Sequence, residues 1–197
     1  FVCHHGDASL TPVAKTAANN VTEYHSFAGK HPAGLAGTHI HFLHPIMRGV
    51  TVWTIGYQDV IAIGKLFTTG RLYTRRMISL AGPAVNTPHL IATERGADIT
   101  ALTKGQLAAG ENRVISGSVL SGRKVFSNVA YLGRFHNQVS VLPEGRERPA
   151  FHFFTAGKNR FSKLPIYISP FFGGKKYNFT TTSNGSPRAM VPIGVYE

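Results

Sequence analysis

The chain has 197 residues, of which 43% are hydrophobic and 15% charged, and its formal net charge is +12. This composition excludes a disordered chain and allows one large folded domain or two small ones. The single cysteine, Cys3, excludes an intrachain disulfide and a cysteine-ligated iron–sulfur cluster, and no apolar run is long enough to span a bilayer.

The first third of the sequence alternates between strand and helix patterns. Residues 1–3 predict the end of a strand, 12–18 a short helix and 21–27 a second strand. In the segment 30–45, two glycines followed by apolar residues predict a turn that opens a short helix, which Pro45 closes. The β-branched run 50–55 predicts a strand, and the apolar stripe of 58–69 predicts a helix that ends at Gly70. This order implies a parallel or mixed sheet covered by helices.

The middle of the chain has a different pattern. Residues 76–82 and 89–93 predict a hairpin, 98–107 a short helix and 112–116 a third strand, which is the order of a β-grasp module. From 125 to 197 the chain is β-rich and aromatic, with Gly173-Gly174 predicting a hairpin turn. Its aromatic stretch 151–179 fits a core or an interface, and could also host a quinone.

Three histidines, His39, His41 and His44, form a His-x-His-x-x-His cluster. In a strand, His39 and His41 would share a face, as a metal site could use. In a helix, His41 and His44 would share a face while His39 points away. We favour the helix, and because acidic residues are scarce here, with Glu23 the nearest, we expect no metal.

A glycine turn entering a helix exposes backbone N–H groups to an anion or a polar ligand head. The residues at this turn and in the following helix are therefore the ligand candidates: His31, Gly34, Gly37, His39 and His41. The full dinucleotide pattern Gly-x-Gly-x-x-Gly is absent, as is a Walker motif.

No catalytic residue is predicted in this chain. Cys3 and His4 are neighbours in a strand-like run and would point to opposite faces. The acidic residues show no pairing that suggests acid–base hydrolysis. The positive charge favours an anionic partner, either an acidic protein face or an anionic membrane surface, unless it is an ordinary solvated surface. Without an arginine-rich tract or an aromatic RNA-binding signature, we expect no nucleic acid.

The segment His31-Pro32-Ala33-Gly34-Leu35-Ala36-Gly37-Thr38-His39-Ile40-His41-Phe42-Leu43 resembles a signature block of the A subunit of the bacterial Na+-translocating NADH:quinone reductases. Further blocks agree in order along the chain: 57–62, 79–83, 113–120, 131–134, 178–182 and 190–194. The family is related to the flavin-carrying subunit of complex I and to the Rnf complex C subunit. The flavin-carrying relatives have an acidic residue after the glycine, where this chain has Leu35-Ala36. They also have a cysteine-rich cluster motif that would fall near residues 189–192, where this chain has no cysteine.

The resemblance implies an α/β, overall α+β, fold in three parts. A partial Rossmann-like α/β region spans 1–75, a soluble-ligand-binding β-grasp domain spans 76–122, and a β-rich segment spans 123–197 and leads to a missing C-terminal helical domain. Because the chain starts at Phe1 without methionine, we expect an internal fragment.

The same resemblance implies a function. The family's complex oxidises NADH, reduces ubiquinone and exports Na+, so the chain would belong to an oxidoreductase while being non-catalytic itself, a docking scaffold that contacts quinone. FMN, riboflavin, FAD and a [2Fe-2S] cluster would lie in other subunits, with no cofactor on this fragment. The partners would be five further subunits, at the cytoplasmic face of the bacterial inner membrane. The alternatives are a stand-alone β-grasp ligand-binding module and a flavin or metal enzyme on the same fold.

Overall fold

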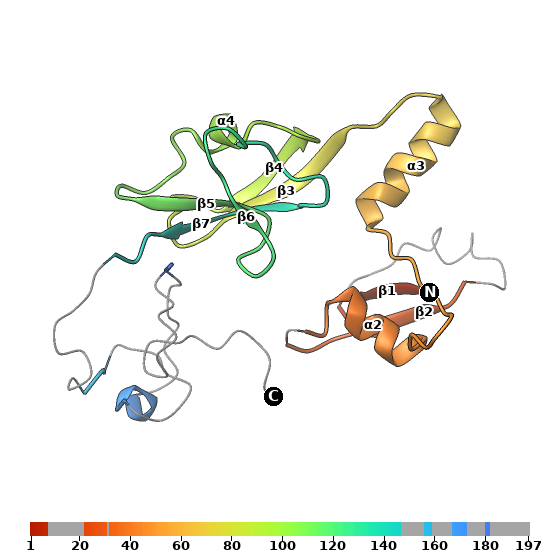
Figure 1. Cartoon of the computed structure of the whole chain (residues 1–197), viewed down its shortest axis with the longest axis horizontal. Helices are drawn as coiled ribbons and strands as arrows, with labels where there is room; N and C mark the ends of the chain where they lie inside the picture. Colours follow the sequence, from red (N-terminus) through yellow and green to blue (C-terminus); the bar gives the residue numbers. More distant parts are fainter. Residues whose placement is uncertain (8–21, 31, 147–155, 159–166, 173–179, 182–197) are drawn as a thin grey trace. The chain divides into compact units, whose positions relative to one another are not determined.

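The computed structural model describes residues 1–7, 22–30, 32–146, 156–158, 167–172 and 180–181 (Figure 1). The chain forms two compact units, one built from Phe1–Gly56 and the other from Tyr57–Val191. The predicted helix at 12–18, the hairpin turn at Gly173-Gly174 and the candidate His31 lie outside the described residues.

The first unit contains two short strands, β1 (Val2–His5) and β2 (Tyr24–Phe27), and the helix α2 (Ala36–Leu43). The strands run parallel, with Val2 opposite Tyr24 and His5 opposite Phe27. Parallel pairing followed by a helix confirms the α/β character predicted for this part of the chain.

Helix α2 confirms the helix predicted between the glycine turn and Pro45. Its first residue follows Leu35, which has extended backbone (φ −86°, ψ 140°), and its last residue is Leu43. The next residue, His44, caps the helix, and its N–H donates to the carbonyl of Ile40. The glycines before and within it are not needed for the backbone, because neither Gly34 nor Gly37 has a positive φ. A Cβ added at either glycine would meet nothing within 4 Å.

The strand predicted at 50–55 is wrong. These residues have no regular structure. A β-branched run becomes a strand only where a partner completes its hydrogen-bond ladder, and β1 and β2 pair only with each other in the described part of the chain. The segment instead contributes Val52, Trp53, Thr54 and Ile55 to the wall of a cavity.

The second unit is built on a five-stranded mixed sheet in the order β4-β3-β7-β5-β6. Its strands are β3 (Arg75–Ala81), β4 (His89–Glu94), β5 (Asn112–Ser116), β6 (Arg123–Lys124) and β7 (Gln138–Pro143). β3 and β4 form the predicted antiparallel hairpin, while β7 runs parallel to β3 and antiparallel to β5. The hydrophobic core of this unit includes Ile78, Leu80, Val139 and Val141 from the sheet and Ile99 from the helix that follows β4.

Helix α4 (Ile99–Thr103) lies between β4 and β5 in the sequence. Asp98 caps it, because its side chain accepts the N–H of Thr100 at 2.8 Å. It is shorter than the predicted 98–107, because Lys104 leaves helical geometry and Gly105 follows with φ +72°. Gly82 has a structural reason: its φ is +133°, and a Cβ there would collide with the carbonyl of Val141 on β7.

β7 lies between β3 and β5, so the sheet continues beyond residue 122. The domain boundaries at 75/76 and 122/123 stay predictions. A short 3-10 helix, η2 (Ser169–Phe172), is described further along the chain. No described helix has the length and apolar character that a membrane crossing requires.

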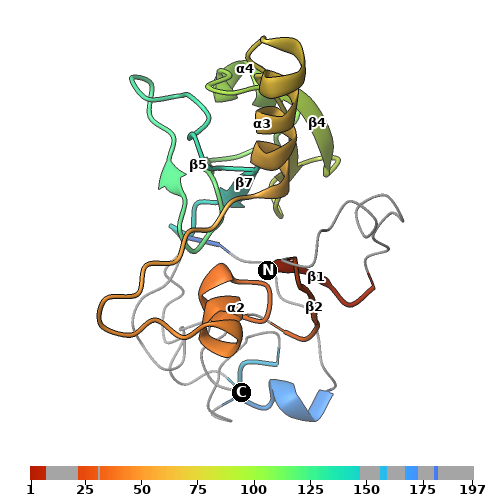
Figure 2. The same ribbon diagram turned by 90° about the vertical axis from the view of Figure 1, so that its right-hand side faces the viewer.

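Helix α3 (Tyr57–Thr69) confirms the helix predicted at 58–69. Figure 1 shows it joined to β3 by a short connection, and Figure 2 shows the same helix from another side. Its first turn is bonded to the sheet. The Gln58 side chain donates to the carbonyl of Met77 at 2.8 Å and accepts the N–H of Met77 at 2.9 Å. Gln58 thus completes the hydrogen bonding of β3 just before the register with β7 begins at Ser79.

Candidate functional site

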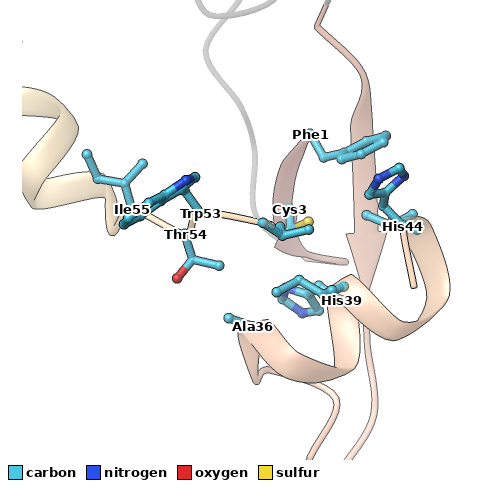
Figure 3. A pocket seen from close by; sticks show the side chains of 11 residues that line it. Phe1, Cys3, Ala36, His39, His44, Trp53, Thr54 and Ile55 are labelled. Atoms are coloured by element: carbon cyan, nitrogen blue, oxygen red, sulfur yellow. The ribbon is translucent and has the colours of Figure 1, made fainter. Parts of the chain in front are cut away.

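A cavity of about 280 Å³ lies in the first unit between β1, α2 and the segment 52–55 (Figure 3). Apolar side chains form most of its wall: Phe1, Ile40, Leu43, Val52, Trp53 and Ile55. Its polar side chains are Cys3, His39, His44 and Thr54. An apolar wall with a few polar groups is the usual make-up of a site for a small organic ligand.

His39 is fixed on the α2 side of this cavity by two contacts. Its Nε2 lies 2.8 Å from the carbonyl oxygen of Ala33, and its ring stacks on Phe27 with centroids 4.1 Å apart. A carbonyl oxygen can only accept, so Nε2 carries a proton and donates it to this hydrogen bond. Figure 3 shows the ring on the side of α2 that faces Cys3.

The histidine that joins His39 at the cavity is His44, not His41. The expectation that His41 and His44 share a face while His39 points away is therefore wrong. It assumed that the helix includes His44, whereas His44 is the residue after the last turn, with φ −154°. His41 is exposed and its ring packs edge-on against Phe42, with centroids 5.2 Å apart.

Of the predicted ligand candidates, the structure brings together only some. Gly34 lines a second cavity of about 320 Å³ with His39, Cys3 and the His4-His5 pair. Gly37 and His41 line neither of these two cavities. Whether the predicted residues bind a ligand stays a prediction.

Sequence reasoning considered Cys3 only as a nucleophile and did not consider Trp53 as a site residue. Cys3 lines both cavities, and Trp53 flanks the first of them. The β-branched residues of 50–55 predicted a strand, and a strand gave no reason to place Trp53 at a ligand site. Among the described residues, no three His, Cys, Asp or Glu side chains are grouped so that they could hold a metal ion.

The second unit has a groove of its own, of about 550 Å³, between α3 and the hairpin β3–β4. Its wall is mostly apolar and includes Tyr57, Ile61, Tyr73, Met77 and Leu90. Arg75 and Arg76 add two cationic groups to it. The groove therefore combines an apolar surface with positive charge.

Comparison with known proteins gives consistent results along the whole chain. Residues 1–72 match the family described as the NqrA second alpha/beta domain, and residues 77–127 match the NQRA C-terminal domain. A protein of Saccharophagus degradans, named as the A subunit of a Na(+)-translocating NADH-quinone reductase, is 62% identical over all 197 residues. Proteins of the same name from Cellvibrio japonicus and Vibrio alginolyticus are 58% and 53% identical over the same length.

In each of these three comparisons the chain spans 43% of the relative's length. The identity extends over the two matched domains and beyond them to the last residue of the chain. The chain belongs to the NqrA family, the A subunits of the Na+-translocating NADH-quinone reductases.

Proposed function

We propose that the chain is the central part of a peripheral subunit of a Na+-translocating NADH:ubiquinone oxidoreductase, in which NADH oxidation and quinone reduction drive sodium export. The observation that carries this proposal is the identity shared with proteins of that name from the first to the last residue. The chain serves as a docking scaffold without chemistry of its own, and the flavins FMN, riboflavin and FAD and the [2Fe-2S] cluster lie in other subunits.

Exposed apolar side chains support a docking role. In the first unit, Phe42 and Met47 are each 70% exposed and Trp53 is 90% exposed. In the second unit, α3 buries only Ala62 and leaves Phe67 84% exposed. Exposed apolar surface on this scale marks interaction sites. Together with the net charge of +12, it suits contact with other subunits at the cytoplasmic face of the bacterial inner membrane.

The cavity of the first unit suits contact with a quinone head group. Trp53, Leu43 and Ile40 offer apolar surface to a ring, and the wall carries histidine N–H groups that could donate to a quinone carbonyl. Since Nε2 of His39 already donates to Ala33, the ring of His44 is the better donor. A volume of about 280 Å³ has room for the head group but not for a long isoprenoid tail, which would lie outside.

The docking role is tested by replacing Trp53 with glutamate in the full complex. The matched control is Thr51→Glu, which places the same charge on an exposed residue of the same segment. We expect Trp53→Glu to reduce the amount of the other subunits that copurify with the tagged full-length protein, and Thr51→Glu to leave it unchanged. Membranes that keep full Na+-dependent NADH:quinone reductase activity after the gene is deleted would contradict the proposed function itself.

The quinone contact is tested separately by titrating the full-length protein with a quinone head-group analogue. We expect saturable binding that His44→Ala weakens and that His41→Ala, outside the cavity, does not. Absence of saturable binding would remove the quinone contact and leave the docking role intact.

The groove on the second unit favours one alternative, a β-grasp module that binds a soluble ligand. Its volume of about 550 Å³ lies in the usual range for small-molecule sites. A stand-alone module would purify without membrane subunits, whereas the reductase component would bring them with it.

A further inference from the structure

Four charged side chains from separate parts of the second unit meet at the base of α3. Asp59 lies in the first turn of the helix, Arg76 on β3, Arg95 just after β4 and Arg134 in the loop before β7. All three guanidinium groups donate to the same carboxylate oxygen, Oδ1 of Asp59. The Arg95 contact is 2.9 Å and the Arg134 contact is 3.2 Å.

The charges of this cluster do not balance. Arginine remains protonated in proteins, so three cations face one anion and leave an excess charge of +2. Among the described residues, Asp59 is the one carboxylate that forms an ion pair with any of the three arginines. The side chain of Arg76 is 5% exposed, that of Arg95 23% and that of Asp59 21%, so water screens the excess charge only in part.

The electrostatics of the individual groups show the imbalance. The pKa of Arg95 is lowered, first by its burial and then by the charges of Arg134 and Arg76. Burial raises the pKa of Asp59, but the hydrogen bonds and charges of Arg76 and Arg134 outweigh it and lower the pKa below its usual value. The Nε of Arg95 is buried and has no hydrogen-bond partner among the described residues. The cluster therefore has surplus donors as well as surplus charge.

One of the three arginines gives access to the cluster. The side chain of Arg134 is 48% exposed, and its guanidinium lies 5.0 Å from the ring centroid of Phe135, itself 81% exposed. An anion arriving from solvent would meet Arg134 first and could then share Arg95 with Asp59. A small turn of the Arg95 guanidinium would let Nε donate as well.

We propose that Arg134 and Arg95, beside Asp59, form a binding site for a phosphate-type oxyanion. The fork of a guanidinium group matches two oxygens of a phosphate, and two forks suit one tetrahedral anion. A phosphate dianion neutralises the excess of +2, whereas a single carboxylate would leave half of it. Two sources present this chemistry: a soluble phosphate or phosphomonoester, and a lipid whose head group is a phosphomonoester, such as phosphatidic acid.

The test is calorimetric titration of the full-length protein with inorganic phosphate, at an ionic strength kept constant with sodium chloride. We expect saturable binding that Arg134→Gln weakens about tenfold or more, the loss expected for one charge-assisted hydrogen bond. The matched control is Arg71→Gln, because Arg71 is exposed and lies outside the cluster. The proposal is overturned if phosphate shows no saturable binding, if Arg134→Gln binds like the wild type, or if Arg71→Gln weakens binding as much.

A second measurement guards against a misfolded variant. Phosphate should raise the unfolding temperature of the wild type and of Arg71→Gln, and raise that of Arg134→Gln much less. The unfolding temperature of Arg134→Gln without phosphate reports whether it is folded. An equal shift in all three proteins would also overturn the proposal.

A further arm identifies the source of the anion. Flotation with vesicles that contain phosphatidic acid compares the wild type with Arg134→Gln, with phosphatidylcholine vesicles, which have zero net charge, as the control. If the lipid head group is the ligand, inorganic phosphate competes with the anionic vesicles and Arg134→Gln floats less. If a soluble phosphate is the ligand, flotation is the same for the two proteins.

Discussion

The ion cluster at Asp59 allows a quantitative prediction for the variant Asp59→Asn. The change keeps the shape of the side chain and an acceptor oxygen, and removes the negative charge that Arg76, Arg95 and Arg134 share. Removing one partner of a buried ion pair costs about 3–5 kcal/mol, whereas an exposed pair contributes less than about 1 kcal/mol. Arg76 belongs to the first regime, at 5% exposed, and Arg134 to the second, at 48%.

Because the asparagine side chain would still accept one hydrogen bond, we expect the variant to lose about 3 kcal/mol, near the lower end of the buried range. The loss falls on the contact between α3 and the sheet, so local opening there should become roughly a hundredfold more frequent. Hydrogen exchange of peptides from α3 and β3, measured by mass spectrometry on the full-length protein, reports this directly. The control is Asp7→Asn, since the Asp7 side chain is 96% exposed.

The contribution of Asp59 to stability should depend on pH, and the direction of its pKa shift fixes how. The pKa of Asp59 is lower in the folded protein than its usual 3.8. A carboxylate whose pKa is lowered by folding contributes stability that is fully present above pH 3.8. This stability is lost as the pH falls through the pKa of the folded state. Asp59→Asn should abolish this part of the acid sensitivity. Exchange in α3 and β3 that matches the wild type within about 0.5 kcal/mol would refute the reasoning.

Two further predictions concern stability. Gly82→Ala should destabilise the second unit by more than about 2 kcal/mol, because the new Cβ would collide with Val141 at φ +133°; Gly34→Ala, which meets nothing within 4 Å, should change the unfolding free energy little in urea titrations. Burial and then the charge of Arg123 lower the pKa of His136, whose Nδ1 lies 2.8 Å from Ser116 Oγ. The stability that neutral His136 contributes is therefore present above pH 6.5 and is lost as the pH falls through the pKa of His136 in the folded state. His136→Gln should remove this step from a plot of unfolding free energy against pH.

The elements with strong local signals were predictable from the sequence. Helix α3 follows from its apolar stripe and Gly70, and α2 from the flanking Pro45. The order of hairpin, helix and strand from β3 to β5 follows from turn residues such as Gly82-Pro83. In each of these cases the signal lies within the element or directly beside it.

The features that the sequence did not predict depend on residues that are distant in sequence or on where an element ends. The run 50–55 has strand propensity, but no strand lies beside it in the described part of the chain to complete a ladder. The pairing of His39 with His44 at the cavity depends on the residue at which α2 ends, a detail finer than periodicity gives. In the cluster at Asp59, the three arginines follow Asp59 in the sequence by 17, 36 and 75 positions, and no local pattern connects them to it.

The stability of Asp59→Asn and the proposed phosphate site rest on the same three arginines, so one experiment links them. Without the carboxylate, the cluster carries an excess charge of +3 instead of +2, and an oxyanion no longer competes with Asp59 for Arg95. Phosphate should therefore stabilise Asp59→Asn more than it stabilises the wild type, measured as the gain in unfolding free energy at one fixed phosphate concentration and ionic strength. Equal gains in the two proteins would mean that phosphate binds elsewhere, and that the arginines serve only to hold α3 against the sheet.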